Sequence, residues 1–500
     1  MKTNILCLVS LFFFSLVFSQ KQVFETNKAF QKPKNNSNTS YALSNSQTDE
    51  VLLIAEGSEL IRAILLDKDY QIKNQSIAKP LQSGFSDFIG YKITKDLYTI
   101  FFTNTKQNKF GVLEFDMSNK MYATKKLDFK LKKEKFVESV FYNNEMYLFT
   151  ISKQSSNINM YVFDDDYNTS KHSFSFKEAE FPNPNSPSFI LDVYDQLVAG
   201  SDTFSPVILN LAKIADENPN VIETTSKEIK LYLKGKHVIF TFDKNHVKTD
   251  VFTINLETKD LEHKAFDKVS KERNEYKKHN SFLYDDILFQ IASENDKMNF
   301  RAIEISSGAI INEYLTAKED TIFYKNSPII QEKSTSDFLG KPVENNRNLE
   351  KTKQFLRKIS SADLGISVYE NNDIYNIVLG GTKAIAGTGG VAAMAFGVAG
   401  GMAGAALAGG IANMNYSFNP VFYGYSSYQN TKSTYINCLF DKNLNHVEGK
   451  IPYNTYDDIN DFESGLEKPK AINVFMHKDK LHYNYLDRET GIFRLYIFEN

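Results

Sequence analysis

The sequence predicts an all-β fold made of short strands joined by tight turns. From Val51 onward, β-branched and aromatic runs alternate with clusters of Asn, Asp, Gly and Lys, which is the pattern of strands and turns. The chain has 500 residues, of which 42% are hydrophobic and 24% are charged. This composition excludes a disordered or collagen-like chain. The length exceeds what one hydrophobic core organises, so we expect two domains or one large repeat fold.

One sequence unit recurs: a turn ending in a charged residue, followed by an aromatic-rich strand. Its copies begin at Asp96, Glu145, Lys236, Asp286, Asp373 and Lys480. The starts are separated by 49, 91, 50, 87 and 107 residues. The separations of 49 and 50 are single periods, and those of 91 and 87 are interpreted as double periods with a degraded copy between. Gln196 marks a candidate for the first degraded copy.

The spacing inside each copy is a stronger signal. A second turn follows the first after 19 or 20 residues in four copies, at Asp116, Asp164, Asn255 and Ile305. A constant offset predicts that each period is a four-stranded meander. In the second copy the expected strands cover residues 136–142, 146–151, 158–163 and 171–176.

Four strands in a repeat of roughly 40 to 50 residues resemble a blade of the β-propeller superfamily. The resemblance covers residues 50–500 at the level of the fold, and it implies seven or eight four-stranded blades. The chain contains no Trp, so the Trp-Asp dipeptide of WD40 blades is missing, and no closer family is identified. The last copy ends after its third strand, so we expect the N-terminal region to supply the outer strand and close the ring. The alternative folds are a β-sandwich array and a β-solenoid.

The N-terminus has the pattern of a secretory signal peptide over residues 1–19. Lys2 precedes an apolar run from Ile5 to Phe18, and cleavage is expected before Gln20. The run is too short for a comfortable membrane anchor, which needs about 20 residues. We therefore predict an exported protein that is periplasmic, envelope-associated or secreted, with a flexible linker over residues 20–49. Cleavage leaves Cys438 as the single cysteine, so no intramolecular disulfide is expected.

A Gly/Ala-rich apolar insertion at residues 384–411 interrupts the repeat just after a predicted strand over 374–379. It holds nine Gly, ten Ala, one Thr and eight large apolar residues, and no charged residue lies between Lys383 and Lys432. Apolar residues recur at spacings of three and four, which predicts a helical hairpin with one apolar face. We predict that this face makes binding contacts through Val391, Met394, Phe396, Val398 and Met402.

The surroundings of the insertion limit its role. A single membrane crossing would place strands of one sheet on opposite sides of the bilayer, and two crossings need about 40 residues. The open alternatives are a hairpin that dips into a membrane, a hairpin packed on a partner protein or on a second copy, and a surface loop without a role. Residues 331–358 form a second, polar excursion, which includes a short charged helix at 349–358.

No local motif predicts chemistry. The net charge of −3 gives no electrostatic reason to expect a nucleic-acid partner. The eight His lack metal-ligand spacing, so neither a metal nor a cofactor is predicted. The acidic stretches 164–166 and 457–461 are interpreted as solvated turns. We predict a binding or scaffold protein of the cell envelope. The alternative is a carbohydrate-active hydrolase or lyase with an acidic site at the propeller axis.

Overall fold

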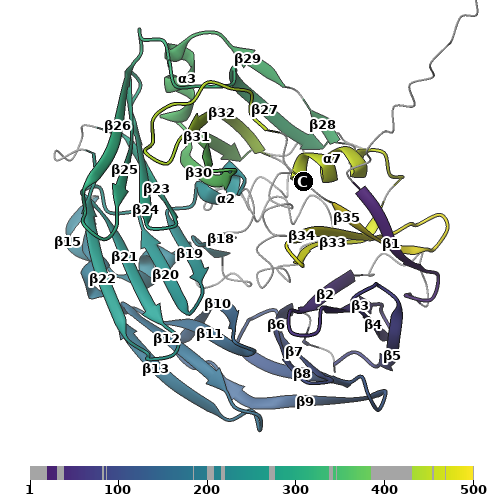
Figure 1. The fold of residues 1–500 in the computed structure, drawn as a ribbon. Coiled ribbons are helices and arrows are strands. Elements are labelled where there is room, and N and C mark those ends of the chain that lie inside the picture. The colour runs from purple at the N-terminus through teal and green to yellow at the C-terminus, as the bar shows by residue number, and fades with distance from the viewer. Residues whose placement is uncertain are drawn as a thin grey trace, which may run out of the picture.

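A ring of antiparallel sheets makes up the described part of the chain (Figure 1). The computed structural model describes residues 20–498, apart from 31–38, 82–83, 86, 184, 200–207, 215–219, 270–275, 337–341, 345, 385–430, 453–454 and 468. Within these residues seven sheets have four or more strands, and each is one blade of a β-propeller. The predicted fold is confirmed, and the ring has seven blades.

The first three blades are simple meanders in which the chain runs from the inner strand to the outer one (Figure 1). Blade 1 contains β2 (Thr39–Asn45), β3 (Glu50–Glu56), β4 (Ile61–Leu66) and β5 (Ile72–Ala78). Blade 2 contains β6 (Asp87–Thr94), β7 (Leu97–Thr103), β8 (Lys109–Asp116) and β9 (Met121–Lys130). Blade 3 contains β10 (Glu134–Tyr142), β11 (Glu145–Ser152), β12 (Asn157–Phe163) and β13 (Thr169–Ser175).

Blades 4 and 5 keep the meander, and blade 4 gains a parallel inner strand. Blade 4 contains β18 (Ala212–Ile214), β19 (Ile229–Lys234), β20 (His237–Phe242), β21 (Lys248–Asn255) and β22 (Leu261–Asp267). Blade 5 contains β23 (Lys278–Tyr284), β24 (Ile287–Ser293), β25 (Lys297–Glu304) and β26 (Ile310–Ala317).

Blades 6 and 7 take strands out of chain order. In blade 6 the outer strand precedes the other three in the sequence, and in blade 7 the outer strand comes from the N-terminus. Blade 6 contains β27 (Ile329–Ser336), β30 (Asp363–Asn371), β31 (Ile374–Ala384) and β32 (Thr431–Phe440), with β28 (Pro342–Glu344) and β29 (Arg347–Leu349) paired to β27. Blade 7 contains β33 (Lys470–His477), β34 (Lys480–Leu486), β35 (Phe493–Phe498) and β1 (Gln20–Thr26).

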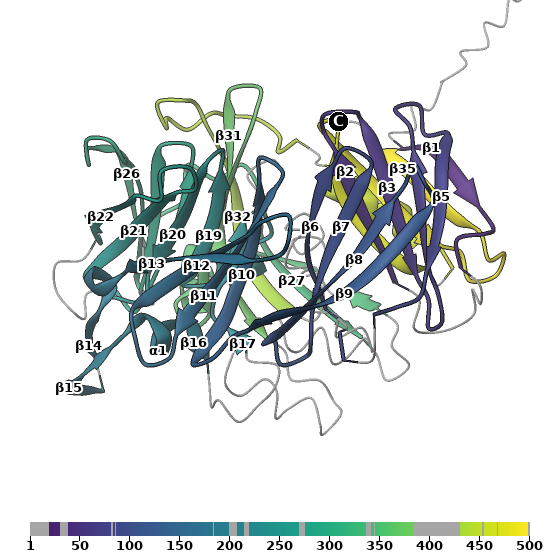
Figure 2. The same cartoon turned by 90° about the horizontal axis from the view of Figure 1, so that it is seen from below.

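Shorter elements connect the blades. Between blades 3 and 4 the chain forms η1 (Lys177–Ala179), β14 (Phe181–Asn183), β15 (Ser186–Leu191), α1 (Val193–Leu197), β16 (Val198–Ala199) and β17 (Ile208–Leu209). The β14–β15 hairpin projects from the ring (Figure 2). The other helices are α2 (Ile222–Thr225), α3 (Thr352–Ile359) and α7 (Thr455–Ser464). Among the described residues, no helix is long and apolar enough to cross a membrane.

The repeated charged turn marks the hairpin between the first and second strands of a blade. The six predicted copies are β7, β11, β20, β24, β31 and β34, each the second strand of the antiparallel meander of its blade, counted from the inner side. Asn143 and Asn144 both have positive φ, as do Asn372 and Asp373. Two successive residues with positive φ form the type I′ turn that matches the twist of the flanking strands, and Asn and Asp tolerate this conformation.

Apolar side chains between neighbouring blades form the core. Tyr41 of blade 1 stacks on Phe88 of blade 2, with ring centroids 4.7 Å apart. Phe149 of blade 3 meets Phe240 of blade 4 at 5.9 Å. The same type of contact recurs around the ring, because each sheet buries one face against the next sheet.

Two predictions about the N-terminal half need correction. The prediction of a flexible linker over residues 20–49 is wrong, because this range contains β1 and β2. In addition, Glu50 begins β3, which is a further copy of the repeat. The prediction of a degraded copy at Gln196 is also wrong, because this residue lies in the short helix α1. The separation of 91 residues therefore reflects a long connection between consecutive blades.

The polar excursion over residues 331–358 is partly integrated into blade 6. Its first residues belong to β27, which pairs with β32 at the outer side of the blade. The charged helix is confirmed as α3, and its side chains Phe355, Leu356 and Ile359 are buried in the core. The acidic stretch 457–461 lies in helix α7 and is not a turn.

The N-terminal strand β1 closes the ring as predicted. It pairs with β35 from Gln20 opposite Phe498 to Thr26 opposite Phe493. The side chain of Phe24 is buried in a cluster that also contains Leu495. Blade 7 is thus assembled from both ends of the described chain, and ring closure removes an exposed strand edge.

A polar cluster fastens blade 7 to blade 1. His482 is fully buried; its Nε2 lies 2.8 Å from the Tyr70 hydroxyl and its Nδ1 lies 3.0 Å from the Lys480 carbonyl oxygen. The carbonyl oxygen needs a donor, so Nδ1 carries the proton and Nε2 accepts from Tyr70. His477 Nδ1 lies 2.7 Å from the Ser44 hydroxyl. Burial lowers the pKa of His482 to about 3.

Replacing Phe24 with Ala is expected to lower the free energy of unfolding by about 3 kcal/mol, because a buried aromatic ring is lost at the strand that closes the ring. Urea denaturation of the purified mature chain measures the change. Lys21→Ala, on the exposed side of the same strand, is the control and is expected to change stability by less than about 0.5 kcal/mol. Equal losses for both variants would contradict the role assigned to β1.

Stability is expected to fall as the pH drops below the ordinary His pKa of 6.5. Burial lowers the pKa of both His482 and His279 to about 3. Below pH 6.5 the unfolded chain therefore binds protons that the folded chain does not, so acid favours unfolding. Urea midpoints at about pH 7.5 and 5.5 measure this difference. His482→Gln should reduce the difference and His172→Gln, on outer strand β13, should not. An unchanged difference in the His482 variant would refute the assignment.

Candidate functional site

The insertion emerges from one continuous hairpin of blade 6. Strands β31 and β32 pair without a register shift from Tyr375 opposite Phe440 to Ala384 opposite Thr431. Both ends of the intervening segment therefore leave the blade side by side. Both flanking strands belong to one sheet, so they lie on the same side of any membrane. A single membrane crossing by this segment is therefore geometrically excluded.

The residues predicted to make binding contacts lie outside the described residues. These are Val391, Met394, Phe396, Val398 and Met402. The structure describes the base of the insertion, which ends at Ala384 on one strand and begins again at Thr431 on the other.

The base of the insertion is closely packed against neighbouring segments. A Cβ atom on Gly381 would lie 2.9 Å from the Ala362 Cβ and 3.3 Å from the Ile359 Cα, at the end of α3. On the other side of the blade, a Cβ on Gly365 would lie 2.8 Å from the Ile222 side chain of α2. Side chains at these positions would collide, so glycine permits the two helices to pack directly on the sheet.

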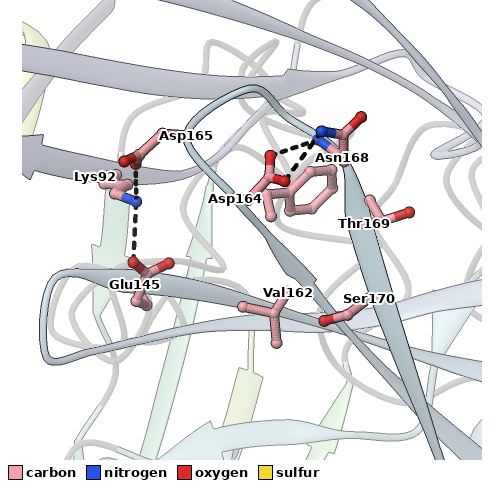
Figure 3. Close-up of a pocket in the computed structure, with 9 residues that line it drawn as sticks. Lys92, Glu145, Val162, Asp164, Asp165, Asn168, Thr169 and Ser170 are labelled. Atoms are coloured by element: carbon pink, nitrogen blue, oxygen red, sulfur yellow. Dashed lines mark hydrogen bonds and ion pairs between the residues drawn. The ribbon is translucent and has the colours of Figure 1, made fainter.

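A surface pocket of about 460 Å³ lies where blade 3 meets Lys92 of blade 2 (Figure 3). The Lys92 ammonium contacts Glu145 at 2.9 Å and Asp165 at 2.8 Å. Burial lowers the pKa of Lys92, but hydrogen bonds from this group to Asp165 and Glu145 outweigh it and raise the pKa overall. The ammonium group is therefore held charged between two carboxylates from different turns of blade 3.

The rest of the pocket is a tight acidic turn. The Asp164 carboxylate accepts hydrogen bonds from the Asn168 side chain at 3.0 Å and from its backbone N–H at 2.8 Å (Figure 3). The hydrogen bond from the Asn168 side chain lowers the pKa of Asp164. This geometry matches the solvated turn that was predicted for residues 164–166.

The pocket does not supply the carboxylate pair that a glycoside hydrolase needs. Such enzymes hold two carboxyl groups roughly 5 to 10 Å apart with room for the scissile bond between them. Here the Lys92 ammonium occupies the space between Glu145 and Asp165 (Figure 3). Within the described parts of the chain, no cluster of three or more His, Cys, Asp or Glu could hold a metal ion. A carbohydrate-active site at the axis stays a prediction.

A buried charge cluster joins blades 4 and 5. Asp243, which follows β20, lies 3.7 Å from Lys230 and 3.8 Å from Lys268. Its carboxylate also accepts hydrogen bonds from the Ser281 hydroxyl at 2.6 Å and the Thr249 hydroxyl at 2.8 Å. Burial opposes ionisation of Asp243, but the two ammonium groups and the two hydroxyls keep its pKa below the usual value.

The two lysines are held in the cluster by further acceptors. Lys230 donates to the Asn280 side chain and to the Lys227 carbonyl oxygen, both at 2.7 Å. Burial lowers the pKa of Lys230 to about 8, and the charge of Asp243 partly counters this effect. Asn280 also donates to the Leu364 carbonyl oxygen of blade 6 at 2.7 Å. The cluster thus links three blades through buried polar contacts.

Cys438 and His482 are buried and have packing roles. Cys438 is fully buried in β32, and burial raises the pKa of its thiol, which agrees with a packed strand residue. His482 is buried, as described for the blade 7–blade 1 contact, and His237 begins β20. Sequence reasoning missed Lys92 and Asp243, because their partners come from other strands and blades and leave no local motif.

Replacing Asp243 with Ala is expected to lower the free energy of unfolding by about 3 to 5 kcal/mol, because two buried ammonium groups would lose their counter-ion. Urea denaturation at neutral pH measures the loss. Asp260→Ala, at an exposed turn of the same blade, should change stability by less than about 0.5 kcal/mol. A loss in the Asp243 variant no larger than in this control would show that the cluster does not hold the blades together.

Comparison with known proteins identifies no family for this chain. No protein-family model matches the chain, and no curated protein matches it. The chain is similar to the solved Dos1 propeller, with 10% identity and a TM-score of 0.32 over 96% of this chain and 95% of that one. It is similar to an uncharacterized protein from Listeria monocytogenes, with 10% identity and a TM-score of 0.24 over 69% and 80% of the two chains.

A Synechocystis apocarotenoid oxygenase is also similar, with 6% identity and a TM-score of 0.27. The match covers 56% of this chain and 64% of the oxygenase, so the chain spans just under two thirds of that enzyme. At these identities the similarity concerns the fold alone. The sheet topology alone defines the seven-bladed propeller.

Proposed function

We propose that this chain is an exported binding or scaffold protein of the cell envelope, which contacts a partner or a membrane through the insertion at residues 384–411. The observation that carries the proposal is the hairpin of β31 and β32, whose last pair is Ala384 opposite Thr431. A long uncharged segment is thus presented from two adjacent strands of a packed blade. A rigid support of this kind favours use of the segment as a contact element.

The blade around the insertion is suited to hold it in place. β31 pairs with β30 along its length, and β32 pairs with β27, so both strands that carry the insertion lie inside the sheet. The helices α2 and α3 pack on this sheet at Gly365 and Gly381. The apolar residues proposed for the contact are Val391, Met394, Phe396, Val398 and Met402.

The closure of the ring is compatible with the proposed export. Cleavage before Gln20 would leave all of β1 in the mature chain, where Gln20 pairs with Phe498. The fold described here is held by apolar packing and buried polar contacts, and Cys438, the one cysteine among the described residues, is buried. A protein of this kind needs no disulfide to fold in an oxidising compartment.

Replacing residues 385–430 by a two-residue Asn-Gly turn tests the proposal. Ala384 and Thr431 are cross-strand partners, so a type I′ turn closes the hairpin without altering the blade. We expect the variant to fold with an unchanged urea midpoint and to lose partner capture, self-association or envelope association of the full mature chain. These are measured by crosslinking in cells, size-exclusion chromatography and fractionation.

A second variant separates the apolar face from the bulk of the segment. Serine at the five apolar contact positions should abolish the same interactions, and serine at five alanines of the same segment should leave them intact. The control alanines are Ala386, Ala393, Ala399, Ala405 and Ala408. If localisation, oligomeric state and crosslinks are the same in the deletion variant as in the wild type, the proposal fails.

A further inference from the structure

A cluster of basic side chains surrounds the base of the insertion. We call this set the basic cluster, and its members are Arg347, Arg357, Lys358, Lys383 and Lys432. Lys383 lies near the end of β31 and Lys432 near the start of β32, one residue inside the last strand pair. Arg357 and Lys358 lie in the last turn of α3, and Arg347 lies on β29.

The strand register places like charges opposite each other at this edge. Lys432 is the cross-strand partner of Lys383 on one side and of Lys333 on the other. Three lysines therefore occupy one row across β31, β32 and β27. Like charges in directly opposite positions destabilise a sheet, so the pair of Lys383 and Lys432 costs stability unless an anion lies beside it.

The last turn of helix α3 adds the basic side chains of Arg357 and Lys358 to the same place. The Lys383 ammonium donates to the Ser361 hydroxyl at 3.0 Å, and this hydroxyl lies 3.1 Å from the carbonyl oxygens of both Arg357 and Lys358. Burial lowers the pKa of Lys358 most, and repulsion by the other four members of the basic cluster lowers it further. The positive charges are thus close enough to repel one another.

Three acidic residues lie beside the strand neighbours of Lys383 and Lys432, and each has another partner. Asp363 forms an ion pair with Lys278 of blade 5 at 3.6 Å. Glu332 accepts a hydrogen bond from the Tyr435 hydroxyl at 2.6 Å, and Glu223 of α2 accepts one from the Ser433 hydroxyl. The five basic residues outnumber these three acids, so the base of the insertion carries an excess of positive charge.

We propose that the basic cluster binds the anionic headgroups of a phospholipid surface. This inference rests on the proposed function and names the membrane as the partner of the insertion. The sequence favours lipid over an acidic protein, because Lys383 and Lys432 are the last charges on either side of residues 384–431, which are rich in Gly and Ala and contain several Tyr and Phe. Cations that flank an apolar, aromatic-containing segment are typical of a membrane interface.

Vesicle flotation of the purified mature chain tests the inference. The probes are vesicles of phosphatidylcholine alone and of phosphatidylcholine mixed with phosphatidylglycerol. We expect binding to the mixed vesicles, weakened by salt because the contact is electrostatic. Each basic residue near an anionic surface strengthens binding about fivefold. The variant with Lys358, Lys383 and Lys432 changed to Gln should therefore bind on the order of a hundredfold more weakly.

A matched variant removes three exposed lysines from blade 2, Lys120, Lys126 and Lys130. It has the same net charge as the test variant and should bind the mixed vesicles like the wild type. The urea midpoint of Lys432→Gln should not fall, because the substitution relieves repulsion between Lys432 and Lys383. A lower midpoint would show that the row serves stability.

The other outcomes overturn the inference in distinguishable ways. Equal binding by the test and matched variants means that the basic cluster does not select anionic lipid. A second outcome is binding to both kinds of vesicle that does not depend on salt and is lost when residues 385–430 are deleted. This result would support the proposed function and show that the basic cluster takes no part in it. If the wild type binds neither vesicle while the deletion variant loses a protein crosslink, the partner is a protein and the lipid assignment is wrong.

Discussion

The pairing of β1 with β35 is the contact on which the closed ring depends. Every blade buries one sheet face against the next blade, so an open ring would expose the faces at the break. Gln20 and Phe498 are opposite each other in blade 7, so the two ends of the described chain form a single sheet. This pairing closes the loop with the greatest sequence separation, and its entropic cost is met by the apolar cluster around Phe24 and Phe493.

Apolar packing between the blades is supplemented by buried polar ties. Asp243 and its lysines join blades 4 and 5, Asn280 extends this link to blade 6, and His482 with Tyr70 joins blades 7 and 1. Removal of one partner would leave a buried polar group without compensation. These ties therefore reinforce the order and register of neighbouring blades, which apolar contacts alone define less sharply.

The sequence allowed most of the fold to be predicted, because the hairpin turns are chemically distinct and strand lengths are nearly constant. The predicted copies at Asp96, Glu145 and Lys480 each begin or immediately precede the second strand of a blade. The prediction failed where connections vary in length, as around Gln196, and where a polar stretch hid the strands β1 and β2. The surroundings of Lys92 and Asp243 could not be predicted, because residues far apart in the sequence meet there through the ring.

The placement of the insertion within blade 6 has a mechanical consequence. A force on the segment would be transmitted along β31 and β32, which are hydrogen-bonded to β30 and β27 on their outer sides. The hydrogen bonds of these pairs would be loaded together in shear, whereas an edge strand would peel away one bond at a time. Blade 6 would therefore resist tension applied through the insertion better than a blade that carried it on an edge strand.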